Sequence, residues 1–297
     1  MDDPGRRAGS DRDVDLPVTS VWLTCQQTAR DQRRGRYVSA TRTHPAKMLP
    51  HLAAHAINAY TAPGDLVLDP MCGVGTTLVE AVHAGRDAIG IDIEAKFTTI
   101  AAANLALAKE QGAPGRADVI TGDATRLGVL VPAWARGRVG LVLTSPPYGN
   151  ITHGLVNTIP GEGVHKHDHR YGPPGRGNLA YGGWERLLAG FTQIMTACRD
   201  VLRPGGIVVL TVRPVRRRPD DLIDLPSQIL AAATAVGLEP VERCVALLAG
   251  VRDDQLVHRA SMFAILAARR ARIAGIPVSL VAHEDVLVLR ANPGSSR

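Results

Sequence analysis

The sequence predicts an α/β fold built on one doubly wound, mostly parallel sheet. From residue 64 onward, strand-like runs alternate with segments of helical periodicity. This alternation predicts a parallel sheet covered on both faces, and right-handed crossovers make the sheet doubly wound. Polar, glycine and proline residues also gather at the ends of the strand-like runs. Because ligands bind at those carboxyl ends in such sheets, the same pattern predicts where the functional site lies.

The predicted strands are short and mainly apolar. In chain order they are "DLVLD" (65–69), "DAIGIDI" (87–93), "ADVITGDA" (117–124), "VGLVLTSPPY" (139–148), "IVVLTV" (207–212), "VERCVALL" (241–248) and "SMFAILAAR" (261–269). The predicted helices are "TTLVEAVHAG" (76–85), "EAKFTTIAAANLALAKEQG" (94–112), "GGWERLLAGFTQIMTACRDVLRPGG" (182–206) and "SQILAAATAVGL" (227–238). Gly85 ends the first helix, and Pro204 with two glycines ends the third. The whole arrangement is Rossmann-like.

Length and composition suit one large domain over residues 17–291. The chain has 297 residues and is 45% hydrophobic. Residues 1–16 are charged and lack an apolar stretch, and residues 292–297 are similar, so we expect both to be disordered tails. No apolar run reaches the roughly 18 residues of a membrane span. Since no signal peptide is recognisable either, we expect a cytoplasmic protein without membrane contact.

Cysteine spacing and charge restrict the classes of function further. The four cysteines are far apart and form no C-x-x-C pair, which argues against zinc and against secretion. The formal charge is +6, with 30 arginines and only four lysines. This balance is compatible with a polyanionic partner.

The stretch "DPMCGVGTT" (69–77) connects a predicted strand to a predicted helix. Gly73 and Gly75 allow a tight turn and a close approach of the backbone to a ligand, although an ordinary strand–helix turn has the same pattern. No Gly-Lys-Ser/Thr follows, and the third glycine of the dinucleotide fingerprint is missing. The loop therefore fits neither a phosphate loop nor a dinucleotide site.

Acids end the next two predicted strands. At Asp92, an acid accepts hydrogen bonds from ribose hydroxyls or caps the following helix. At Asp123, a carboxylate accepts from an adenine amine or forms a turn. Together with the glycine loop, the two acids fit an adenosyl ligand without a pyrophosphate, which points to S-adenosylmethionine.

The sharpest feature is "TSPPYGN" (144–150), where a buried-looking strand ends on two prolines that cannot donate to a sheet. Ser145 Oγ and the Pro146 carbonyl are two fixed acceptors that can hold both hydrogens of an exocyclic amine. The lone pair of the amine then points at a methyl donor. Tyr148 offers an aromatic face on which a base can stack. The alternative is a proline-rich strand exit without a functional role.

In this order, the motifs resemble those of the amino-methylating DNA methyltransferases, especially the N4-cytosine type. The family's cofactor loop, Asp-Pro-Phe-x-Gly-x-Gly-Thr, is matched by "DPMCGVGT", with Met71 in place of the phenylalanine. The family's catalytic Asp/Asn/Ser-Pro-Pro-Tyr/Phe is matched by "SPPY". "THPAKMLP" (43–50) resembles the segment that lines the methionine end of the cofactor, and "HEDVLVLR" (283–290) resembles the closing strand. The resemblance covers roughly residues 36–291.

The resemblance implies the class I fold of S-adenosylmethionine-dependent methyltransferases and S-adenosylmethionine as the cofactor. It assigns cofactor contacts to Thr43, His44, Pro45, Lys47, Asp69, Pro70, Met71, Gly73, Gly75, Thr76, Asp92, Ile93, Asp123 and Ala124. It assigns catalysis to Ser145, Pro146, Pro147 and Tyr148.

The implied activity is methylation of the exocyclic N4 amine of a cytosine in duplex DNA. Serine at the position of Ser145 is typical of cytosine-N4 enzymes, whereas Asp or Asn is typical of adenine-N6 enzymes. The cofactor segment comes first here, whereas many cytosine-N4 enzymes have the catalytic segment first. Because the amine of a paired base is inaccessible, we expect the base to flip out and stack on Tyr148. Adenine-N6 methylation, guanine-N2 methylation of RNA and a catalytically inactive, nucleic-acid-binding subunit stay open as alternatives.

The long loop over residues 149–183 predicts a positively charged lid that faces the DNA. The residues expected to contact DNA are Arg170, Tyr171, Arg176, Asn178, Arg216 and Arg217. The last two belong to the basic run "RPVRRR" (213–218), for which a solvated surface run is the alternative. His165, His167 and His169 alternate in the loop but match no usual zinc pattern, so we expect no metal. The resemblance implies duplex DNA as the partner and is compatible with a cognate restriction endonuclease. Neither a recognition sequence nor an oligomeric state follows from the sequence.

Overall fold

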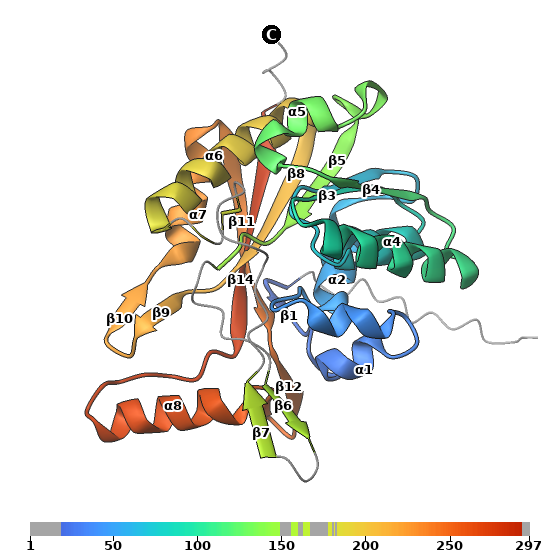
Figure 1. The fold of residues 1–297 in the computed structure, drawn as a ribbon. Coiled ribbons are helices and arrows are strands. Elements are labelled where there is room, and N and C mark those ends of the chain that lie inside the picture. The colour runs from blue at the N-terminus through green and yellow to red at the C-terminus, as the bar shows by residue number, and fades with distance from the viewer. Residues whose placement is uncertain are drawn as a thin grey trace, which may run out of the picture.

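The computed structural model describes residues 19–148, 156–159, 163–166, 178–179, 181 and 183–292. These residues build one eight-stranded sheet with helices on both faces (Figure 1). The two tails predicted from the sequence lie outside the described residues, apart from Asn292.

The strands of the sheet run in the order β1-β11-β14-β8-β5-β2-β3-β4. Their bounds are β1 Val21–Trp22, β2 Leu66–Asp69, β3 Asp87–Asp92, β4 Ala117–Thr121, β5 Val139–Thr144, β8 Leu202–Val212, β11 Leu238–Leu247 and β14 His283–Ala291. The pairs from β8 to β4 are parallel, while β14 is antiparallel to both β8 and β11. The mostly parallel, doubly wound sheet predicted from the sequence is thereby confirmed.

Helices cover both faces of this sheet. They are α1 Ala29–Arg33, α2 Pro50–Tyr60, α3 Thr76–His83, α4 Ala95–Glu110, α5 Leu127–Leu130, α6 Gly183–Val201, α7 Leu225–Ala235 and α8 Met262–Ile273. Figure 1 shows α5, α6 and α7 over one face and α2 and α4 over the other. Alternate residues of a strand serve the two cores, because successive side chains point to opposite faces. In β5, Val142 joins the core with Phe191 of α6, whereas Leu141 and Leu143 join the core with Leu52 of α2.

In the part of the chain that the structure describes, three two-stranded hairpins lie outside the main sheet. They are β6–β7 (Val156–Ile159 and Gly163–Lys166), β9–β10 (Val215–Arg218 and Asp221–Ile223) and β12–β13 (Ala249–Arg252 and Gln255–His258). The third predicted helix was expected to run to Gly206, but α6 ends at Val201 and β8 begins at Leu202. Within the described ranges, no helix is long and apolar enough to cross a membrane.

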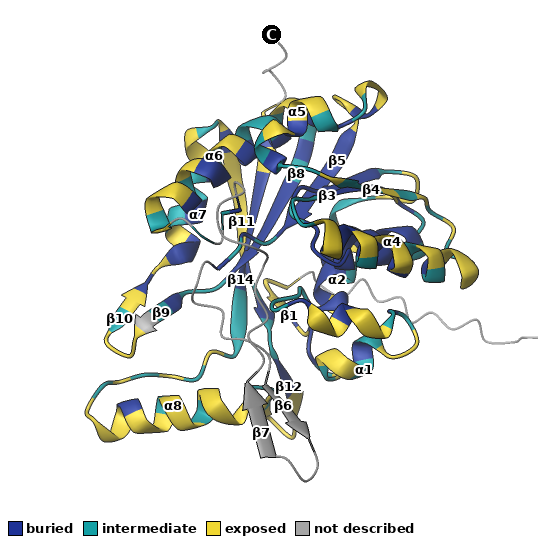
Figure 2. Ribbon diagram, viewed as in Figure 1, coloured by how far each residue is buried: buried dark blue, intermediate teal, exposed yellow. Residues whose placement is uncertain are grey.

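The predicted strand over residues 261–269 is wrong, because the chain forms α8 there. Ser261 caps the helix, and its side chain accepts a hydrogen bond from the Ala264 backbone N–H. The following run of Ala, Leu and Arg has high helix propensity. Figure 2 shows α8 exposed along most of its length, and Ala271 is its buried residue. The helix follows the β12–β13 hairpin and leads into β14, so it is an insertion between two sheet strands.

Candidate active site

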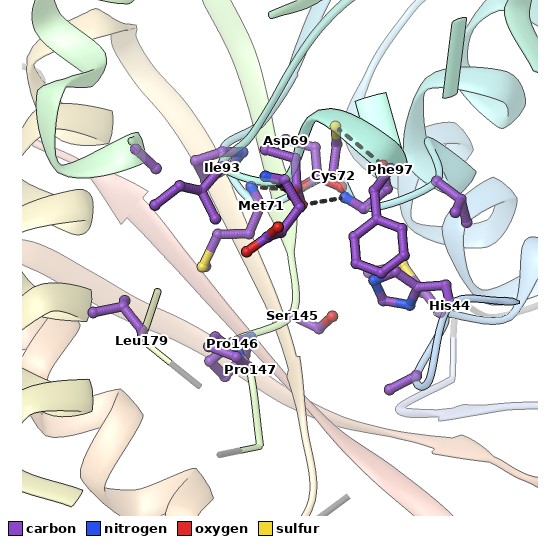
Figure 3. Close-up of a pocket in the computed structure, with 18 of the residues that line it drawn as sticks. His44, Asp69, Met71, Cys72, Ile93, Phe97, Ser145, Pro146, Pro147 and Leu179 are labelled. Atoms are coloured by element: carbon purple, nitrogen blue, oxygen red, sulfur yellow. Dashed lines mark hydrogen bonds between the residues drawn. The ribbon is translucent and has the colours of Figure 1, made fainter. Parts of the chain in front are cut away.

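A pocket lies at the carboxyl ends of β2, β3 and β5, which are neighbours in the sheet (Figure 3). It brings together all the predicted cofactor and catalytic residues except Thr43, Pro45 and Gly75. The residues that it gathers are His44, Lys47, Asp69, Pro70, Met71, Gly73, Thr76, Asp92, Ile93, Asp123, Ala124, Ser145, Pro146, Pro147 and Tyr148. Motifs that are far apart in the sequence therefore share one cavity.

The loop between β2 and α3 depends on its two glycines. Gly73 has φ +52° and Gly75 has φ +80°, a backbone region that other residues rarely adopt. A Cβ on Gly73 would lie 2.9 Å from His44 Nε2, and a Cβ on Gly75 would lie 3.0 Å from the Cβ of Ala101. Gly75 is the N-cap residue of α3, so it shapes the loop without lining the pocket.

Asp92, the last residue of β3, is held by the backbone of two loops. Its Oδ2 accepts from the Gly73 N–H at 2.8 Å, and its Oδ1 accepts from the Glu94 N–H at 2.9 Å. Burial raises the pKa of Asp92 to about 6, although both backbone hydrogen bonds oppose this. Each carboxylate oxygen keeps a further lone pair. A pair of ribose hydroxyls fits such an aimed, pocket-lining carboxylate.

Asp123 begins the short turn after β4. Its Oδ1 accepts from both the backbone N–H and the hydroxyl of Thr125, at 2.9 and 2.8 Å. Within the part of the chain that the structure describes, no group donates to Asp123 Oδ2. Asp123 and the neighbouring Ala124 line the pocket wall, where they fit an adenine amine and ring. The acids and the glycine loop therefore fit S-adenosylmethionine.

Asp69, the last residue of β2, lies below the loop with 4% of its surface exposed. Its carboxylate accepts from Thr77 Oγ1 at 2.7 Å, from Thr144 Oγ1 at 2.8 Å and from the Met71 N–H at 3.1 Å. Burial raises the pKa of Asp69 to about 6, against the lowering effect of the hydroxyl donors. The carboxylate thus connects the cofactor loop to the end of β5.

The "SPPY" segment follows directly on β5. Figure 3 shows Ser145 between the two prolines and His44, and all four residues line the pocket. Tyr148 is 6% exposed, and the Arg213 guanidinium lies 5.2 Å from the centre of its ring. Arg213 is not among the residues that line the pocket.

The segment before α2 supplies the wall opposite the prolines. The His44 ring packs edge-on against Phe97, with 4.3 Å between the ring centres. Burial, assisted by the charge of Lys47, lowers the pKa of His44 to about 3, so the ring is neutral. Burial also lowers the pKa of Lys47 to about 8, and its Nζ donates to the His44 carbonyl at 2.6 Å. Thr43 is exposed and its hydroxyl donates to the Ala40 carbonyl, so it does not line the pocket.

Among the residues predicted to contact DNA, Asn178 lies in the wall of the pocket. It is 7% exposed, lines the pocket, and donates from Nδ2 to Glu94 Oε1 at 2.9 Å. A contact of Asn178 with DNA stays a prediction. Arg216 lies on the β9–β10 hairpin and donates to the Pro219 carbonyl at 2.7 Å.

The remaining predictions for this region fall partly outside the structure. Arg170, Tyr171 and Arg176 lie outside the described residues, as do His167 and His169. The side chains of His165 and Arg217 are likewise not described. Among the residues that are described, no group of three His, Cys, Asp or Glu side chains is arranged to hold a metal ion.

Several pocket residues were not predicted from the sequence. They are Ala46, Met48, Cys72, Val74, Thr77, Glu94, Phe97, Leu179 and Ile194. Phe97 and Glu94 had a usable signal, because they stand at the start of the helix that follows Asp92. Leu179 and Ile194 had none, since they reach the pocket through the packing of α6 and the residues before it.

Parts of this chain are similar in sequence to known proteins. A family model described as "DNA methylase" matches residues 6–103. A type II methyltransferase of Methanocaldococcus jannaschii, M.MjaII, is 32% identical over 72 residues, which are 24% of this chain and 14% of that protein. A tRNA (guanine(10)-N2)-dimethyltransferase of the same organism is 34% identical over 108 residues, which are 36% of this chain and 30% of that protein. The chain thus matches less than a third of the length of either relative.

The crystal structure of TrmN from Thermus thermophilus has a TM-score of 0.50 to this chain, with 18% identity, over 88% of this chain and 53% of that one. At this identity the likeness concerns the fold alone. The chain therefore has the class I fold of S-adenosylmethionine-dependent methyltransferases, its matches support an amino-methylating methyltransferase, and fold and matches together imply S-adenosylmethionine as the cofactor.

Proposed function

We propose that this protein methylates the N4 amine of a flipped-out cytosine in duplex DNA. The observation that carries the proposal is the shared pocket, which Ser145 and the two prolines line together with the glycine loop and Asp92. Acceptors for an amine and a site for an adenosyl methyl donor thus meet in one cavity.

The cofactor would be held from three strand ends. Asp92 would accept from its ribose hydroxyls, Asp123 Oδ2 from its adenine amine, and the Gly73 backbone would lie against it. Lys47 is the cation of the pocket wall that would face its carboxylate. When bound, S-adenosylmethionine supplies a methyl group already activated on a sulfonium.

The chain's own groups orient the base. Ser145 Oγ and the Pro146 carbonyl accept the two amine hydrogens, so the nitrogen lone pair is aimed and one hydrogen is polarised for loss as a proton. The ring of Tyr148 supports the base from one side, braced by Arg213. Positioning is the main requirement here, because the methyl donor needs no further activation.

Serine rather than Asp or Asn before the prolines favours cytosine over adenine. A short hydroxyl leaves both acceptors where a pyrimidine amine sits. Since relatives named type II methyltransferases match this chain, a cognate restriction endonuclease and a place in a restriction–modification pair belong to the same proposal.

A second candidate, guanine-N2 methylation of RNA, is favoured by the relative that acts on tRNA. Incubation of the purified chain with radiolabelled S-adenosylmethionine separates the two, with duplex DNA and total tRNA offered in parallel. We expect the wild type to label the DNA. The Ser145→Ala variant should label it at no more than about a tenth of the wild-type rate. Label in tRNA alone would replace the DNA proposal by the RNA one.

A further inference from the structure

A buried chain of three side chains connects the cofactor loop with the catalytic segment. Thr77 lies in the first turn of α3, Asp69 ends β2, and Thr144 ends β5 one residue before Ser145. Both threonine hydroxyls donate to Asp69, at 2.7 and 2.8 Å. The three residues are 1%, 4% and 0% exposed, so water does not replace these bonds.

These three side chains lie beyond the last backbone pair between β2 and β5. The ladder between β2 and β5 ends at the pair Leu68 and Val142. Beyond it, the Thr144 hydroxyl and the Asp69 carboxylate make the side-chain bond between the two strand ends. A movement of the loop after β2 is therefore transmitted through the Asp69 carboxylate to Thr144, the residue before Ser145.

A carboxylate is a costly group for this position if it only fills the core. Burial, with a smaller contribution from the nearby Asp92, raises the pKa of Asp69 to about 6. No Lys or Arg among the described residues forms an ion pair with it. An ionised acid there accepts from donors on both sides at once, which an apolar residue of the same size does not.

We propose that Asp69 is a positioning residue that, with Thr77 and Thr144, couples the state of the cofactor loop to the placement of Ser145. The methyl-transfer consequence rests on the proposed function, whereas the coupling itself needs only cofactor binding. When the loop is ordered by its ligand, the end of β5 is held at the same time. Without the bond, ligand binding orders the loop but leaves the amine acceptors loose.

The chain offers a matched control on the neighbouring strand. Thr211 in β8 is 0% exposed, like Thr144, and follows Leu210, the pairing partner of Thr144. Its hydroxyl has no hydrogen-bond partner within the described structure. Thr144→Val and Thr211→Val therefore remove the same atoms from equally buried strand positions, but only the first removes a bond to Asp69.

The experiment measures hydrogen exchange of the peptide over residues 139–148 in the full chain, with and without S-adenosylmethionine, beside calorimetry of cofactor binding. In the wild type we expect the cofactor to slow exchange at Ser145 and Tyr148 by roughly tenfold or more, the effect of one strong hydrogen bond. Thr144→Val should still bind the cofactor within about threefold of wild type but lose most of that protection. Thr144→Ser, which keeps the hydroxyl, and Thr211→Val should both behave as wild type.

Full protection in Thr144→Val overturns the proposal, and so does an equal loss in Thr211→Val, which would mean general loosening of the core. If Thr144→Val does not fold, Thr77→Val removes the other hydrogen bond to Asp69. We then expect the same loss of protection from hydrogen exchange. Methyl transfer to DNA is a separate readout. A wild type that shows the protection but methylates no DNA contradicts the proposed function and leaves the coupling standing.

Discussion

At the scale of single residues, Asp92 is the proposed cofactor contact that the sequence pattern indicates most directly. Two backbone N–H groups donate to its carboxylate, and burial raises its pKa to about 6. Its place at a strand end could be predicted from the sequence, whereas its bond to Gly73 could not. That bond depends on how the loop after β2 folds back over β3.

We predict that Asp92→Asn weakens S-adenosylmethionine binding by roughly tenfold to a hundredfold, the worth of about 1–3 kcal/mol. The amide keeps the shape but has one acceptor oxygen instead of two. Calorimetry measures the affinity, and Asp118→Asn on the exposed edge of β4 is the matched control. Equal affinities of the two variants would remove Asp92 from the cofactor site.

The raised pKa values of Asp69 and Asp92, both about 6, predict a pH dependence of binding. Between pH 7 and pH 5 the carboxylate of Asp92 takes up a proton, so we expect the cofactor affinity to fall by roughly tenfold. The folded state holds these two protons more tightly than the unfolded chain does. Their contribution to stability therefore rises as the pH falls from about 6 towards 4, opposite to the affinity.

Calorimetry from pH 7 to pH 5, with thermal unfolding at each pH, checks this prediction. Asp92→Asn should bind with an affinity that changes less over the same range. A wild-type affinity that stays constant down to pH 5 would show that the carboxylate does not need to be ionised for binding.

Arg213 was predicted only as one member of a basic run, but it has a specific contact. Its guanidinium lies over the Tyr148 ring, and its charge also lowers the pKa of Glu284, which burial raises. We predict that Arg213→Met raises the KM for DNA by roughly threefold to thirtyfold, because a cation over an aromatic ring contributes about 0.5–2 kcal/mol. Cofactor affinity should stay unchanged. Arg216→Met, whose guanidinium binds the Pro219 carbonyl instead, should raise the KM less; a larger effect of Arg216→Met would contradict the bracing role.

At the scale of elements, the segment before α2 is fastened to two helices. Arg36 and Tyr37 both donate to the Glu80 carboxylate of α3, at distances of 2.6 to 3.0 Å. Asn104 of α4 accepts from the Val38 N–H at 2.8 Å. These contacts fix the stretch that leads to the pocket residue His44. The sequence showed the resemblance of this stretch to a cofactor-lining segment, but the polar network depends on helices that lie 40 or more residues later.

We predict that Glu80→Ala lowers the free energy of unfolding by roughly 2–4 kcal/mol, because it leaves Arg36 and Tyr37 without their buried acceptor. Urea unfolding measures the loss, and Glu110→Ala at the exposed end of α4 is the control. Cofactor affinity should fall as well, since His44 loses its anchorage. A loss below about 0.5 kcal/mol would mean that the network contributes little to the fold.

The helix α8 shows where prediction from periodicity ends. A short apolar run such as "MFAIL" is compatible with a strand or with a helix. The N-cap at Ser261 favours a helix. In addition, no strand among the described residues lies beside this segment to pair with it. Met262 and Ile273 remain 66% and 77% exposed, so burial did not guide the choice either.

At the scale of the whole molecule, the strand-end rule accounts for most of the site. Four neighbouring strands end at or shortly before Asp69, Asp92, Asp123 and Ser145. Because these strands are parallel, the four residues come to the same edge of the sheet. The same rule says nothing of Asn178, whose side chain reaches Glu94 from a region 84 residues later. It also gives no place to the last strand, β14, which is inserted between β8 and β11.

The central claim is methyl transfer to an exocyclic amine of DNA by the pocket that contains Ser145. The most direct measurement is mass spectrometry of the nucleosides from DNA of a host without its own methylases, which expresses this chain or its Ser145→Ala variant. We predict N4-methylcytosine with the wild type and a loss of roughly tenfold to a hundredfold with the variant, the worth of about 1–3 kcal/mol. N6-methyladenine would correct the base and keep the mechanism. C5-methylcytosine would contradict the account, because that chemistry needs a cysteine nucleophile that the "SPPY" segment does not supply.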